Sequence, residues 1–191
     1  MFKQHLTYYR RRGSPCQETA TPVPPRSENR HLNALVGRWR SQGRIPATGI
    51  DPEIRITGSD TYEWLAGEHF LIHRVDVRMN EEHVEVIEMI GPYDPESRSY
   101  PMRSFDNHGN FVTMRASVDD RGVWTFAGET ERATLVIAED GESMTAEWER
   151  TDDGSNWQHW MDMSFGRASS PSAVRTGERL SAESDRPGST A

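Results

Sequence analysis

The sequence predicts an all-β fold, a ten-stranded antiparallel up-and-down barrel capped by a short N-terminal helix. Three observations support this prediction. Apolar runs of strand length follow one another with no helical segment between them, and turn-forming residues such as "DNHGN", "DDRG" and "EDGE" separate these runs. Ten strands in an open sheet would also leave long unpaired edges, which closure into a barrel removes.

The elements can be followed in chain order. Leu32, Leu35 and Val36 have the i, i+3, i+4 spacing of a short helix, and Gly37 suits its C-cap. The expected strands cover residues 37–44, 54–65, 68–79, 83–91, 98–106, 110–118, 122–128, 132–139, 142–150 and 156–167. The stretch "RIPATGIDPE" (44–53) is the longest connection, and we therefore expect it to form a lid or rim.

Composition divides the chain into three parts. Residues 1–30 read as a Pro-rich N-terminal tail and residues 168–191 as a C-terminal tail. Both are poor in apolar residues and rich in Pro, Ser, Thr, Arg and Glu, so we expect both to be disordered. Residues 31–167 hold the barrel domain.

The predicted domain is acidic. Residues 31–167 contain 25 of the 30 acidic side chains but only 13 of the 22 basic ones. Such a surface repels nucleic acid and anionic membranes, so we expect neither as a partner. No apolar run reaches the roughly 18 residues of a membrane span. The N-terminus lacks the apolar segment of a secretory signal, and a cytoplasmic location is the expectation.

Two residue types are missing from the predicted domain. The only cysteine is Cys16 and the only lysine is Lys3, and both lie in the N-terminal tail. The domain therefore has no disulfide framework and no Cys-based zinc site. It also lacks a cysteine nucleophile, a Schiff-base lysine and a P-loop lysine.

Strand alternation indicates which side chains face the lumen. Successive side chains of a strand point to opposite faces, and the mostly apolar face should point inward. Residues 68–79, 142–150 and 156–167 each show such a face, whereas Glu88 and Arg103 share faces with apolar residues in less regular strands. The expected lumen residues are Leu71, His73, Glu88, Arg103, Trp148, His159 and Met161.

Four segments resemble a known family. They are "LNALVGRW", "YEWLAGEHFLIHR", "YDPESRSYPMRSFDNHGN" and "GESMTAEWERTDDGSNWQHWMDMSFGR". Together they resemble an uncharacterised bacterial domain-of-unknown-function family of calycin-like barrels, related in shape to lipocalins and fatty-acid-binding proteins. The resemblance covers about residues 31–167 and carries no established activity.

The resemblance also implies a structural role for the Gly37-x-Trp39 opening. In lipocalins the tryptophan of this motif packs at the closed end of the barrel, with an arginine from a late strand lying across it. Trp39 would take that role here, with Arg150 or Arg167 as its partner. A guanidinium over an indole face contributes about 0.5–2 kcal/mol.

The histidines do not form a recognisable metal motif, and we expect no metal site. His69 and His73 share a strand face but lie ~13 Å apart along it, too far to bind one ion. A haem alternative rests on His159. The stretch "HWMDMSFGR" loosely resembles the last strand of nitrobindins, which bind haem through a histidine, and an imidazole in an apolar cavity is a suitable haem ligand.

These observations favour a binding protein for a small apolar or amphipathic molecule held in the lumen. We expect no cofactor, with haem on His159 as the alternative. A second alternative is a small barrel enzyme using His73, Glu88 and Arg103, although no catalytic residue can be assigned and a non-enzyme is favoured. Arg103 could instead bind a ligand carboxylate. The oligomeric state stays open, with a homodimer among the options.

Overall fold

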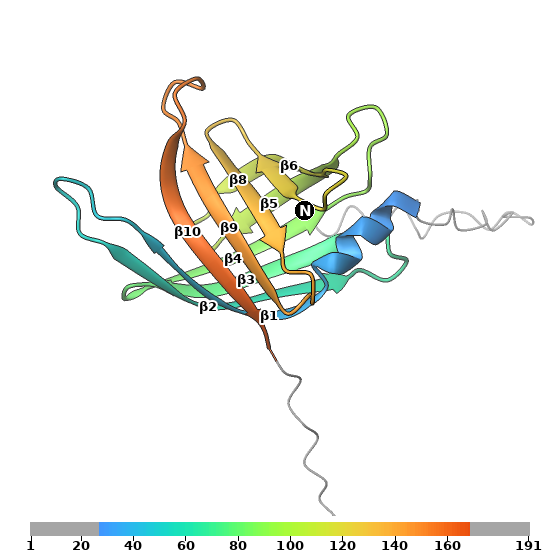
Figure 1. Cartoon of the computed structure of the whole chain (residues 1–191), viewed down its shortest axis with the longest axis horizontal. Helices are drawn as coiled ribbons and strands as arrows, with labels where there is room; N and C mark the ends of the chain where they lie inside the picture. Colours follow the sequence, from blue (N-terminus) through green and yellow to red (C-terminus); the bar gives the residue numbers. More distant parts are fainter. Residues whose placement is uncertain (1–26, 169–191) are drawn as a thin grey trace, which may run out of the picture.

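Ten antiparallel strands close into a barrel in which β1 pairs with both β2 and β10 (Figure 1). The structure is a computed structural model, and it describes residues 27–168. The elements are η1 (Ser27–Ala34), β1 (Gly37–Ile45), β2 (Ile54–Trp64), β3 (Leu71–Met79), β4 (Glu82–Ile90), β5 (Tyr100–Asp106), β6 (Phe111–Val118), β7 (Trp124–Ala127), β8 (Glu131–Ile137), β9 (Ser143–Arg150) and β10 (Gln158–Arg167). The predicted all-β class and up-and-down order are confirmed.

The strand bounds follow the prediction closely, with one larger difference. β3 begins at Leu71 and not at residue 68, because the chain before it forms a tight turn. Gly67 and Glu68 both have positive φ angles, 97° and 55°. That conformation does not continue a strand. The β1–β2 loop, predicted as a lid or rim, extends away from the barrel at the end remote from η1 (Figure 1).

Helix η1 is a 3-10 helix and begins earlier than the predicted domain boundary at residue 31. Residues 27–30 therefore belong to the folded domain. Asn29 is buried, and its side chain donates to the Glu68 carbonyl (3.0 Å) and accepts from the Tyr93 amide (3.2 Å). Leu32 and Leu35 are fully buried, as the i, i+3 repeat of a 3-10 turn requires. Ala168, the first residue of the predicted C-terminal tail, donates its amide to the Arg38 carbonyl at 2.8 Å, and residues 1–26 and 169–191 lie outside the described residues.

Trp39 forms the floor of the barrel. Its indole N–H donates to the Leu35 carbonyl at 2.8 Å, and the side chain is fully buried. Arg167 lies across it, with the guanidinium carbon 4.2 Å from the ring centroid. The same guanidinium donates to the carbonyls of Val36 (3.0 Å) and Gly141 (2.9 Å). One side chain thus ties the end of the capping segment and the β8–β9 turn to the last strand.

Gly37 is required at the start of β1. Its φ is +134°, and a Cβ atom there would lie 2.6 Å from Arg167 Nη1. Arg150, the other predicted partner of Trp39, lies instead at the opposite end of the barrel, since it ends β9 where β10 begins. It is exposed and stands over Trp160 at 5.3 Å. The closing role predicted for Arg150 is therefore wrong, and Arg167 makes that contact.

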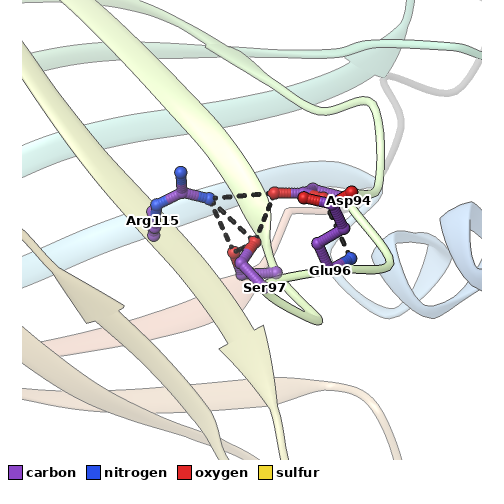
Figure 2. A network of polar contacts seen from close by, with 5 residues as sticks. Asp94, Glu96, Ser97 and Arg115 are labelled. Atoms are coloured by element: carbon purple, nitrogen blue, oxygen red, sulfur yellow. Dashed lines mark hydrogen bonds and ion pairs between the residues drawn. The ribbon is translucent and has the colours of Figure 1, made fainter.

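The β4–β5 connection is fastened by Arg115 from the outer face of β6 (Figure 2). Its Nη1 donates to Ser97 Oγ (2.9 Å) and Ser99 Oγ (3.1 Å) and lies 3.5 Å from an Asp94 oxygen. Hydrogen bonds from Ser97 and from the Glu96 amide lower the pKa of Asp94. Because most of these groups are exposed, the network orders the loop more than it stabilises the fold.

Replacing Arg167 with alanine should destabilise the barrel by about 3 kcal/mol, because the cation–π contact and two charged hydrogen bonds are lost. Urea unfolding followed by tryptophan fluorescence measures this change. The matched control is Arg150→Ala, which should cost less than about 1 kcal/mol because Arg150 is exposed. Equal effects of the two substitutions would contradict the role of Arg167.

Candidate functional site

The barrel encloses a cavity of about 270 Å³. Most of its wall is aliphatic, aromatic or methionine: Ile56, Val75, Val77, Met79, Val84, Val86, Ile90, Met102, Phe126, Ala133, Leu135, Ala146, Trp148, Trp160, Met161, Met163 and Phe165. The remaining lining residues are polar, Asp60, Tyr62, His73 and Glu88, and they come from three neighbouring strands. The lumen therefore has one polar side and an apolar remainder.

Register brings the polar side chains together. Tyr62 on β2 pairs with His73 on β3, and His73 pairs with Glu88 on β4. Asp60 lies two residues before Tyr62 and so projects from the same face of β2. His73 Nε2 is 2.6 Å from Asp60 Oδ1, and His73 Nδ1 is 2.6 Å from Glu88 Oε2. We call Asp60, His73 and Glu88 the lumen triad.

The triad is well shielded from solvent. The exposed side-chain fractions are 6% for Asp60, 9% for His73 and 15% for Glu88. The Ser41 hydroxyl, from β1, donates to the second oxygen of Asp60. The second oxygen of Glu88, Oε1, makes no hydrogen bond to any of residues 27–168. Glu88 therefore offers one unused acceptor on the cavity wall.

His73 is held in its charged form. Burial lowers the pKa of His73, but hydrogen bonds and charges from Asp60 and Glu88 outweigh burial and raise it from 6.5 to about 9. At neutral pH both ring nitrogens are thus N–H donors, one to each carboxylate. The triad thus sets two carboxyl groups against a single imidazolium.

Tyr62 covers one face of the His73 ring. The two ring centroids are 3.9 Å apart and the planes are 5° from parallel. Burial, together with the charges of Asp60 and Glu88, raises the pKa of Tyr62 well above its usual value. The Tyr62 hydroxyl therefore stays protonated, and it has no hydrogen-bond partner among the described residues.

Four of the predicted lumen residues line the cavity: His73, Glu88, Trp148 and Met161. Leu71 points inward but is fully buried in the core beneath the cavity and is not part of its wall. His73 and Glu88, named together in the predicted enzyme alternative, are brought into contact by the pairing of β3 with β4.

Arg103 does not face the lumen, and the prediction that it does is wrong. It is exposed, whereas its neighbour Met102 is buried and lines the cavity. Its cross-strand partners, Met89 and Thr113, are also exposed. The inward face of β5 is set by Tyr100 and Met102, and alternation then places Arg103 outside.

His159 also lies outside the lumen, contrary to the prediction. A β-bulge between His159 and Met161 shifts the register of β10 against β9. As a result Trp160 and Met161 both line the cavity, and simple alternation fails at this point. The His159 side chain is 47% exposed and pairs with Asp162 at 3.1 Å. It is not placed to hold a haem in the lumen.

The sequence reasoning missed Asp60, Ser41, Tyr62 and Trp160. A signal was present for Asp60, which alternates with Ile56 and Tyr62 on the apolar face of β2. A carboxylate on an apolar strand face is the same signal that led to Glu88. Trp160 had no such signal, because only the bulge turns it inward.

One cluster of potential metal ligands lies outside the lumen. Within residues 27–168, Asp76, His83 and Glu85 are the single group of at least three potential ligand atoms that lie close enough to share an ion. All three side chains are exposed on the outer wall.

No helix among the described residues is long and apolar enough to cross a membrane.

Comparison with solved structures shows the same fold at low sequence identity. The crystal structure of Rv2717c from M. tuberculosis matches with a TM-score of 0.56 and 12% identity, over 76% of this chain and 99% of that one. The S-type phycobiliprotein lyase CPES from Guillardia theta matches with a TM-score of 0.51 and 12% identity, over 77% of this chain and 100% of that one. Comparison with curated proteins gives no match.

The fold and its interior define a small closed β-barrel with a mostly apolar cavity. The family follows from the sequence itself. Residues 24–167 match the family described as protein of unknown function (DUF1579), and the chain belongs to that family. The predicted resemblance to an uncharacterised barrel family is thereby confirmed.

Folding stability should fall between about pH 6.5 and pH 9.5. The folded protein holds the His73 proton more tightly than the unfolded chain does, because the pKa of His73 is raised to about 9. This contribution, up to about 3 kcal/mol, is complete below the unfolded pKa and is lost as pH rises through the folded pKa. Urea unfolding at several pH values measures it. In His73→Gln the decline should largely disappear, and an unchanged pH profile in that variant would contradict the assignment.

Proposed function

We propose that this protein binds a small, largely apolar molecule in the lumen of its barrel. The observation that carries the proposal is the cavity itself, which is apolar except for the lumen triad and Tyr62. Sites for small molecules are typically apolar concavities with a few polar groups that fix orientation. The structural similarities above concern the fold alone, so the proposal rests on the cavity of this chain.

The size of the cavity limits the ligand. Its volume of about 270 Å³ lies just below the roughly 300–1,000 Å³ usual for ligand sites. Methionine side chains in the wall, Met79, Met102, Met161 and Met163, can adapt to different shapes. A compact molecule with one polar end fits this arrangement.

Among the described residues, no histidine on the cavity wall is free to ligate haem. Its candidate ligand, His159, is outside the lumen and paired with Asp162. The histidine that does line the cavity, His73, has both ring nitrogens engaged by carboxylates. The residues on the cavity wall therefore do not fit a haem ligated by histidine.

General-base catalysis is a second candidate function, favoured by the contact between His73 and Glu88. His73 itself is a poor base, because both of its nitrogens already carry protons at neutral pH. Glu88 Oε1 has no partner among the described residues and lies on the cavity wall. It could take a proton from a bound molecule, with His73 holding the other oxygen in place.

The binding proposal predicts saturable uptake of a neutral apolar probe. N-phenyl-1-naphthylamine should gain fluorescence when the protein is added. Ala146→Phe should weaken its binding at least ~10-fold, because the larger side chain fills the lumen. Glu147→Gln changes the next residue, on the outer face of β9, and should bind like the wild type. Near-ultraviolet circular dichroism checks folding, with Ala146→Leu as a milder variant. No saturable signal in the wild type would overturn the proposal.

The catalytic candidate predicts ring opening of 5-nitrobenzisoxazole, a generic substrate for carboxylate bases. A base removes its C–H proton while the N–O bond breaks, and the coloured cyanophenolate is followed by absorbance. The wild type should exceed Glu88→Gln by at least ~100-fold in rate. Equal rates for the two proteins would eliminate Glu88 as a general base.

A further inference from the structure

Within the described residues, no side chain on the cavity wall is a cation free to bind an anionic ligand. The arginine expected to do so, Arg103, is on the outer surface. The one positive group on the wall is His73, and Asp60 and Glu88 take both of its N–H groups. A ligand carboxylate entering the lumen would therefore meet two carboxylates and no unused charged donor.

The lumen has a surplus of acceptors instead. Of the four carboxylate oxygens of the triad, two accept from His73 and one accepts from Ser41. The fourth, Glu88 Oε1, is unused within the described chain. The Tyr62 hydroxyl can donate or accept, so it does not select the sign of a ligand's charge.

The balance of donors and acceptors points the same way. Two carboxyl groups share the two N–H groups of one imidazolium, so Glu88 Oε1 is left without a donor on a mostly apolar wall, which is unfavourable for a polar atom there. A ligand ammonium donating to Glu88 Oε1 would supply that donor. Trp148 and Trp160 line the same cavity with their rings edge to face, 6.5 Å apart. Aromatic faces also favour cations over anions.

We propose that the lumen selects a small amphipathic cation, an apolar body with an ammonium-type head that donates to Glu88, over a carboxylate of the same size. This inference rests on the proposed function, since it specifies the ligand of the same cavity. It also reverses the preference expected if Arg103 lined the lumen.

Three ligands with the same octyl chain test the inference: octylammonium, octanol and octanoate. Each is titrated at pH 7 against the full chain by displacement of N-phenyl-1-naphthylamine. We expect octylammonium to bind at least ~10-fold more tightly than octanoate, the effect of one charged hydrogen bond. In Glu88→Gln this preference should fall to within ~3-fold. Glu147→Gln removes a carboxylate from the outer face of β9 and should keep the wild-type preference.

The outcomes separate the two proposals. If octanol and octanoate bind as tightly as octylammonium, lumen binding stands and the cation preference is overturned. If none of the three ligands displaces the probe, or the probe itself does not bind, both proposals fail. Should Glu88→Gln not fold, the ratio of octylammonium to octanoate affinity in the wild type alone decides the question.

Discussion

Pairing of β1 with β10 is the constraint from which the rest of the structure follows. Closure leaves no sheet edge, so all inward side chains of ten strands share one enclosed space. Polar groups in that space depend on one another for most of their hydrogen bonds. The lumen triad does so through two short contacts to His73, and Ser41 supports Asp60 from β1, the antiparallel neighbour of β2.

Local patterns were sufficient to predict the fold. Apolar alternation and turn residues placed all ten strands, and the resemblance narrowed the partner of Trp39 to Arg150 or Arg167, of which Arg167 makes the contact. Local patterns were not sufficient to predict which side chains line the lumen. Arg103 stands in a strand where both faces carry apolar residues, and only pairing with β4 and β6 decides which face is inside. The bulge that turns His159 outward cannot be predicted from the apolar alternation of residues 156–167.

The candidate site depends on contacts between strands, and a single strand shows only part of it. Taken strand by strand, His73 in β3 and Glu88 in β4 are polar residues on mostly apolar faces. The expected role of His73 changes once Asp60 of β2 is included. A histidine between two carboxylates is a cation held in place and cannot act as a free base. The chemistry offered to a ligand then comes from Glu88.

The bulge in β10 changes which side chains line the lumen without changing which strands pair. Its position decides whether His159 or Trp160 faces the lumen, while the strand count and the closure with β1 stay the same. Without this irregularity, strict alternation from Met161 would place His159 on the wall and Trp160 outside, exchanging an indole for an imidazole. The chemistry of the wall at this point therefore depends on one local irregularity in the last strand, while every strand of the barrel stays in place.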